Sequence, residues 1–166
     1  LRGQGRDVCL AIIGSRVGAS DPTNRDYLAE MEAEIERRSL DGLVRWTGHL
    51  PASGVSAWLR AADVAALPYR DGASYRRGRL LAALEHGLPV VTTRAPSPSE
   101  DPEQQAVPEL EHGVNASLVP PDDSVALAAA IAAVLDDASH AGRLRRGAKE
   151  LARAFGWAEI AARHLE

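Results

Sequence analysis

The chain has 166 residues, of which 45% are hydrophobic and 25% are charged, and its formal net charge is -4. This length and apolar content suffice for one core, so we expect a single domain over residues 1–166. The acidic balance and an aromatic content of only 4% argue against a nucleic-acid-binding protein.

Cysteine content and hydropathy predict the compartment. The lone cysteine, Cys9, cannot form an internal disulfide and lies in an apolar run, which predicts a reduced, buried thiol in a cytoplasmic protein. No apolar run reaches the roughly 20 residues that span a bilayer, and no signal-peptide pattern opens the chain. The chain begins without Met, in residues typical of a helix end, so we expect that a preceding part of the protein is missing.

Apolar runs and helical periodicity alternate along the first part of the chain. We expect strands at residues 8–13, 44–47 and 63–67, and helices at residues 23–40 and 53–62. Strands that alternate with helices are joined by right-handed crossovers. The pattern therefore predicts an α/β fold with a doubly wound, Rossmann-like parallel sheet and helices on both faces.

The same alternation continues to the C-terminus. A helix at residues 79–85, ended by Gly87, leads into a strand at residues 88–93, and an exposed loop is expected at residues 94–108. A last strand follows at residues 115–119. Three more helices are then expected, at residues 124–136, 138–154 and 157–165.

The segment from Arg70 to Arg79, around Gly78, is the strongest candidate for a binding site. It contains Arg70, Arg76, Arg77 and Arg79, although the chain as a whole is acidic. Backbone N–H groups at a helix N-terminus suit a phosphate. The predicted diphosphate-binding residues are Arg16, Arg76, Arg77, Gly78, Arg79, Leu80 and Leu81. The alternative is that Gly78 only begins a helix and that the arginines form a solvated face.

Other loops should join this site, because ligands of open parallel sheets bind at the carboxyl ends of the strands. Four loops leave such ends, at residues 14–21, 48–51, 68–78 and 92–99, and we expect them to form one rim. The first of these loops lacks the spaced glycines of an NAD site.

Residues 67–93 resemble the donor-site segment of retaining glycosyltransferases with the GT-B fold, the group 1 family of glycogen-synthase and mannosyltransferase type. Leu67 and Pro68 end a strand as in that family, Glu85 takes the place of the second of two glutamates, and Arg77 takes the place of the first. Gly87, Pro89, Val90 and Val91 match the strand that follows. The resemblance continues through the alanine-rich helix to Phe155 and Trp157, and covers residues 8–165.

The resemblance implies that this chain is the C-terminal, donor-binding lobe of a glycosyltransferase whose acceptor-binding N-terminal lobe is missing, and that the last helix, within residues 157–166, contacts that lobe. The donor substrate would be a nucleotide-diphosphate sugar, and no cofactor is implied. Glu85 would bind the ribose, and the backbone of Gly48, His49 and Leu50 would lie against the nucleobase. His49 could equally be a surface residue. Arg77 could pair with phosphate or with an acidic sugar, or could indicate lost activity.

Metal ligands and nucleophiles are absent from the sequence pattern. The five histidines are scattered without acidic partners at ligand spacing, and no DxD motif occurs, so we expect metal-independent stabilisation of the diphosphate. The basic residues of the 138–154 helix are interpreted as a solvated surface.

These observations predict a hexosyltransferase-like enzyme, retaining by analogy, with no catalytic residue assigned in this chain. The fragment alone should bind a nucleotide and transfer little sugar. Two alternatives remain at this point, a sugar-nucleotide epimerase of GT-B architecture and a non-catalytic interaction module that keeps the fold.

Overall fold

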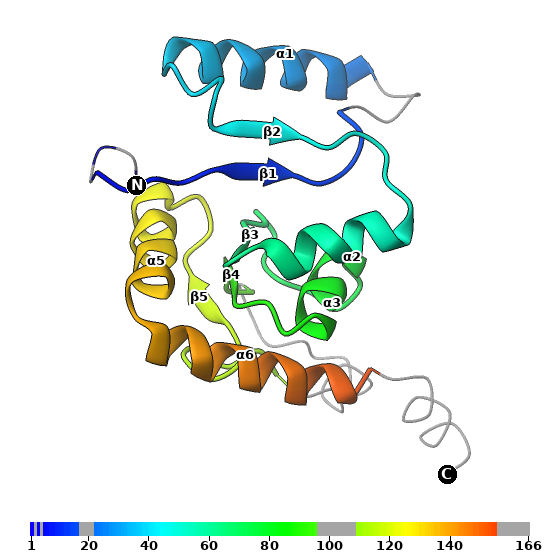
Figure 1. Ribbon diagram of the computed structural model, residues 1–166, viewed down its shortest axis with the longest axis vertical. Helices are drawn as coiled ribbons and strands as arrows, with labels where there is room; N and C mark the ends of the chain where they lie inside the picture. Colours follow the sequence, from blue (N-terminus) through cyan, green and yellow to red (C-terminus); the bar gives the residue numbers. More distant parts are fainter. Residues whose placement is uncertain (2, 4, 17–21, 96–108, 156–166) are drawn as a thin grey trace. The chain divides into compact units, whose positions relative to one another are not determined.

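The computed structural model describes residues 1, 3, 5–16, 22–95 and 109–155 (Figure 1). The chain divides into two compact units, Leu1–Trp58 and Leu59–Glu166, and each is described by itself. The expectation of a single domain, and of one rim formed by loops of both units, stays a prediction. The helix expected at residues 157–165 and most of the 94–108 loop lie outside the described residues.

The first unit contains a strand–helix–strand motif. Strand β1 (Leu10–Ile12) is followed by α1 (Pro22–Arg37) and then by β2 (Val44–Trp46). The two strands are parallel, with Leu10 opposite Val44 and Ile12 opposite Trp46, as the alternating pattern predicts (Figure 1).

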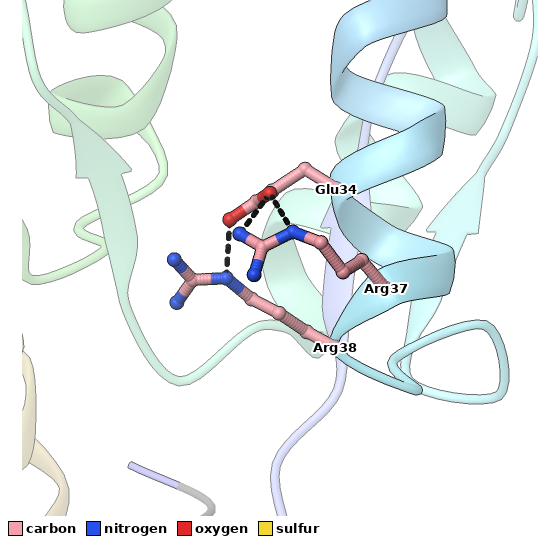
Figure 2. A network of polar contacts seen from close by, with 3 residues as sticks. All are labelled: Glu34, Arg37 and Arg38. Carbon is pink, nitrogen blue, oxygen red and sulfur yellow. Dashed lines mark hydrogen bonds and ion pairs between the residues drawn. The ribbon is translucent and has the colours of Figure 1, made fainter.

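A cluster of charged side chains lies at the C-terminus of α1. The Glu34 carboxylate accepts hydrogen bonds from Arg37 and Arg38, which lie three and four residues further along (Figure 2). The hydrogen bond from Arg37, reinforced by that from Arg38, lowers the pKa of Glu34. Ser39 has a φ of 53°, outside the helical region, so α1 ends earlier than the predicted residue 40.

The second unit contains a three-stranded parallel sheet in the order β3 (Ala65–Leu67), β4 (Val90–Thr93), β5 (Ser117–Val119). In the register, Ala65 lies opposite Val90, and Thr93 lies opposite Val119. The helices that accompany it are the end of α2 (Ala52–Ala61), α3 (Gly78–Glu85), α5 (Ser124–Asp136) and α6 (Ala138–Arg153).

The central strand β4 is buried on both faces. Val90 packs in one hydrophobic cluster with Leu84 of α3 and Leu151 of α6. The next residue, Val91, packs in a second cluster that includes Leu144 of α6. Because successive side chains of a strand point to opposite faces, the sheet is covered on both sides. This confirms the doubly wound architecture.

Two aspartates begin the last helices. The Asp123 carboxylate accepts a hydrogen bond of 2.8 Å from the amide of Ala126, and α5 has the predicted bounds. The Asp137 carboxylate accepts bonds of 3.0 and 2.8 Å from the amides of His140 and Ser139 at the start of α6. These backbone hydrogen bonds, that of His140 first, lower the pKa of Asp137.

The predictions that Cys9 is buried and that the first strand is covered on both faces are wrong. Cys9 is exposed, and Leu10, the first residue of β1, is 52% exposed. The prediction assumed that the whole apolar run forms a strand covered on both faces. In the structure β1 has only three residues, and Cys9 lies before it. Within the described ranges, no single helix has both the length and the composition to cross a bilayer; α5 and α6 would pass only as a pair, bent by 100°.

Candidate functional site

The loop after β3 is folded back onto the loop after β4. A Cβ atom added to Gly72 would lie 2.5 Å from the Cα atom of Ala95, and Gly72 itself has a φ of +81°, so glycine is required there. The amide of Ala73 donates to the carbonyl oxygen of Thr93 at 2.9 Å. Within the second unit, the loops at residues 68–78 and 92–95 therefore meet at the carboxyl ends of the strands, as predicted.

Two threonines at the end of β4 strengthen this junction. The hydroxyl of Thr92 donates to the carbonyl oxygen of Leu67 at 2.7 Å, and the hydroxyl of Thr93 donates to the carbonyl oxygen of Tyr69. Both threonines are buried. The start of the arginine-containing loop is thus attached to the sheet through side-chain hydroxyls.

Arg77 is the most constrained of the four arginines. Its guanidinium carbon lies 4.3 Å from the centroid of the Tyr69 ring, and its Nη2 pairs with the Asp71 carboxylate. The Arg77 side chain is 35% exposed, and its Nε atom is buried without a hydrogen-bond partner among the described residues. The hydroxyl of Tyr69 is also buried and unpartnered. The Nε–H of Arg77 is therefore enclosed by protein, and its lack of a partner costs stability.

Burial raises the pKa of Tyr69, while the nearby positive charges of Arg77 and Arg79 act in the opposite direction. The Tyr69 ring therefore stays neutral and serves as a flat surface for the Arg77 guanidinium.

The other arginines are less constrained. Arg76 and Arg79 are exposed, and Arg70 is 89% exposed and lies 3.5 Å from the Asp122 carboxylate. Arg70 and Arg77 thus lie in the same loop but have different acidic partners, Asp122 and Asp71.

Arg77 is also the N-cap residue of α3. The amides of Leu80 and Leu81 both donate to the Arg77 carbonyl oxygen, at 2.9 and 3.4 Å. Among the described residues the amides of Gly78 and Arg79 have no acceptor, and both residues are exposed. These two N–H groups and the positive end of the helix dipole are available to an anion.

A hollow of about 290 Å³ lies at the carboxyl ends of the three strands of the second unit. Its lining includes Tyr69 and Arg70 after β3, Thr93 at the end of β4, and Pro120 and Asp122 after β5, whereas Arg77, Gly78 and Arg79 do not line it. We did not predict the segment after β5 as part of the site. The signal was available, because Pro120 follows a parallel strand just as Pro68 does.

Glu85 lies apart from this hollow. It is the last residue of α3, it is exposed, and it does not line the hollow. With a rise of about 1.5 Å per residue, seven steps separate it from Gly78 by about 10 Å along the helix axis.

The remaining candidate residues lie in the first unit. Gly14 and Gly48 form a bridge between the ends of β1 and β2, and the Gly14 amide donates to the Thr47 hydroxyl at 3.1 Å. Both glycines have positive φ angles, of 128° and 68°. His49 is exposed and Leu50 is half-buried next to this bridge.

Arg16 has partners of its own in the first unit. Its guanidinium donates to the Glu32 carboxylate at 2.7 Å and lies 5.5 Å from the centroid of the Trp46 ring. A phosphate contact by Arg16 would therefore compete with an exposed ion pair. Across the described part of the chain, no group of three or more His, Cys, Asp or Glu side chains could hold a metal ion.

Comparison with known proteins identifies the class to which this fold and site belong. The sequence profile described as Glycosyl transferases group 1 matches residues 1–137, so the chain belongs to this family. The resemblance noted in the sequence is thereby confirmed.

Relatives of known name are also glycosyltransferases. The chain is 33% identical over 142 residues to the D-inositol 3-phosphate glycosyltransferase of Thermobispora bispora, an alignment that covers 84% of this chain and 29% of that protein. The chain thus spans less than a third of the length of this relative.

Solved structures give the same fold. The HepE protein of Anabaena, crystallised with UDP-glucose, is 25% identical with a TM-score of 0.68, and the match covers 87% of this chain and 36% of HepE. The C-terminal domain of the group 1 glycosyl transferase LpcC from Francisella tularensis is 16% identical with a TM-score of 0.66, covering 92% of this chain and 89% of that domain. The Rossmann-like lobe of the GT-B fold is therefore confirmed.

Proposed function

We propose that this chain is the donor-binding lobe of a glycosyltransferase. It binds a nucleotide-diphosphate sugar, and a lobe outside this sequence binds the acceptor. Family membership and the UDP-glucose bound by HepE support this role, and they favour a transferase over an epimerase or a non-catalytic module. The partial coverage of the relatives supports the involvement of a further lobe.

The observation that carries the proposal is a set of donors at the start of α3. Gly78 and Arg79 contribute exposed backbone N–H groups without an acceptor among the described residues, and Arg77 contributes a guanidinium held over the Tyr69 ring. Donors fixed before the reaction stabilise a leaving diphosphate electrostatically, without a proton transfer from the protein. Among the predicted contacts, the amides of Leu80 and Leu81 are the least available, since each already donates to the Arg77 carbonyl.

The finer assignments belong to the same proposal. Arg76 adds positive charge around the diphosphate, and Glu85 accepts hydrogen bonds from ribose hydroxyls. The roles of Arg16 with the diphosphate and of the Gly48–Leu50 backbone with the base stay predictions from the sequence. The reaction proceeds with retention, transfers a hexose, and requires no metal ion or cofactor. The protein acts in the cytoplasm, and this chain alone transfers little sugar because the acceptor is bound elsewhere.

Calorimetric titration of the 166-residue chain with UDP, GDP and ADP tests the proposal. We expect one of the three to bind with a stoichiometry of one, and the corresponding nucleotide sugar to compete with it. Circular dichroism establishes that the chain is folded. A folded chain that binds none of the three at millimolar concentration would contradict a donor-binding lobe.

A further inference from the structure

A second hollow of the second unit lies at the opposite end of α3 from the Arg77 loop. Its volume is about 270 Å³, and it is formed by the end of α2, the turn between α3 and β4, and the middle of α6. His86 and Gly87 of that turn line it. The eight residues of α3 extend about 12 Å at 1.5 Å per residue, so this hollow is separate from the proposed donor site.

The charged side chains that line this hollow are all basic. They are Arg60 of α2 and Arg145, Arg146 and Lys149 of α6. None of the four forms an ion pair within the part of the chain that the structure describes. Four unpaired cations around one small hollow repel one another, in a chain whose formal net charge is -4.

Lys149 is held in place by the turn beneath it. Gly87 has a φ of +62°, and a Cβ atom there would lie 2.5 Å from Cε and 2.7 Å from Cγ of Lys149. The aliphatic part of Lys149 therefore packs directly on the Gly87 backbone, which only glycine permits at this distance. A lysine whose stem is fixed loses less side-chain entropy when its ammonium group binds an anion.

Capping of α3 does not account for these cations. Positive side chains often compensate the carbonyl groups at a helix C-terminus. Here the carbonyl oxygens of Ala82, Ala83 and Leu84 accept hydrogen bonds from the amides that follow the helix, at 3.2, 3.0 and 2.9 Å. With those carbonyls satisfied by backbone, the basic side chains remain available to a ligand.

We propose that this basic hollow, formed by Arg60, Arg145, Arg146 and Lys149, binds a phosphoryl group. Guanidinium groups bind phosphate oxygens through paired N–H donors, and an ammonium group adds a compact charge. A volume of about 270 Å³ has room for a small phosphorylated compound or the head of an anionic lipid. The site is independent of the donor site.

The test compares two double variants with equal loss of charge. R146Q/K149Q removes two cations of the hollow, whereas R143Q/R153Q removes two exposed arginines of the same helix that do not line it. The soluble probe is inorganic pyrophosphate, titrated by calorimetry in the R77Q background so that the donor site contributes little. The lipid probe is vesicles of phosphatidylglycerol, compared with phosphatidylcholine by co-sedimentation.

We expect R146Q/K149Q to weaken binding of the effective probe by about tenfold or more, as for two lost charge-assisted hydrogen bonds, and R143Q/R153Q to weaken it by less than about twofold. Binding of pyrophosphate alone identifies a soluble phosphorylated ligand, and binding of the anionic vesicles alone identifies a lipid headgroup. Equal losses in both variants would show non-specific attraction and overturn the proposal. Absence of binding to either probe by the folded parent chain would also overturn it.

Discussion

The guanidinium of Arg77 lies over the ring of Tyr69, 4.3 Å from its centroid, while the hydroxyl of the same tyrosine is buried without a hydrogen-bond partner among the described residues. The ring stabilises the position of the cation, whereas the hydroxyl has a cost, because a buried polar atom loses its hydration. The effects of the ring and of the hydroxyl of Tyr69 can therefore be measured separately by mutation.

Tyr69→Phe should leave the stacking unchanged and remove the unsatisfied hydroxyl. We expect the free energy of unfolding to rise by about 0.5–1 kcal/mol, because the folded chain no longer buries an unpaired hydroxyl. Urea denaturation measures this change. A destabilisation of more than about 1 kcal/mol would mean that the hydroxyl has a partner in solution. Tyr69→Leu, which removes the ring, should reduce nucleotide affinity.

Arg77→Gln should weaken nucleoside diphosphate binding by about 1–3 kcal/mol, because it removes a charge-assisted hydrogen bond at the start of α3. Arg153→Gln is the control. Arg153 is an exposed arginine of α6 outside any ion pair of the described residues, so its loss should cost well below 1 kcal/mol. Calorimetry measures both, and equal losses would remove Arg77 from the site. In the full-length protein, Arg77→Glu should change the sugar preference.

Glu85→Gln tests the ribose contact. If Glu85 accepts two hydroxyl hydrogen bonds, the change should reduce nucleoside diphosphate affinity by about 1–3 kcal/mol. It should affect deoxyribonucleotides less, since one hydroxyl is absent from them. Glu150→Gln, an exposed glutamate of α6, is the control. Unchanged affinity in Glu85→Gln would agree with the exposed position of this residue at the far end of α3 and would exclude the role.

Gly72→Ala and Gly78→Ala form a pair in which a methyl group is added at two glycines, one in the loop after β3 and one at the first position of α3. At Gly72 the new methyl group meets the backbone of Ala95 at 2.5 Å with φ at +81°, so we expect a loss of stability of about 2 kcal/mol or more. At Gly78 nothing lies within 4 Å and the residue is helical, so alanine should be neutral or stabilising by up to about 1 kcal/mol. Thermal unfolding of both variants measures the difference. Similar effects would mean that the two loops do not pack as described.

Asp137 gives a pH-dependent prediction. Its pKa is lowered in the folded chain by the hydrogen bonds from His140 and Ser139, so the ionised cap stabilises the fold at pH values above the unfolded pKa. This stabilisation should be lost as the pH falls through the folded pKa. Asp137→Asn keeps an acceptor without the charge, so its melting temperature should fall less than that of the parent chain between pH 6 and roughly pH 3. Parallel pH profiles for the two proteins would assign the acid sensitivity to other groups.

Helices with strong end signals could be predicted from the sequence. Asp123 before an alanine-rich run predicts the start of α5, and Gly87 predicts the end of α3 within two residues. Strand ends were less predictable, because composition does not reveal where pairing stops. The exposed Cys9 shows the same limit, since an apolar run indicates a strand but does not show which faces are covered.

The candidate site was predicted in part. The convergence of the loops after β3 and β4 follows from parallel topology alone. The acidic partners of the arginines do not follow from topology, because such pairs can form between residues far apart in the sequence. Asp122, for example, lies 3.5 Å from Arg70 although 52 positions separate them in the sequence.

The hydroxyls of Thr92 and Thr93 make the end of β4 chemically asymmetric. At Val90 or Val91, exchange for another aliphatic residue disturbs only packing. Thr92 and Thr93 differ, because valine has nearly the same shape as threonine but lacks its hydroxyl. At these two positions, valine would fill nearly the same space but would remove the hydroxyl hydrogen bonds to the carbonyl oxygens of Leu67 and Tyr69, leaving those carbonyls to their backbone donors. We therefore expect β4 to tolerate aliphatic exchange at its first two positions and to require a hydroxyl at its last two, which hold the start of the loop after β3.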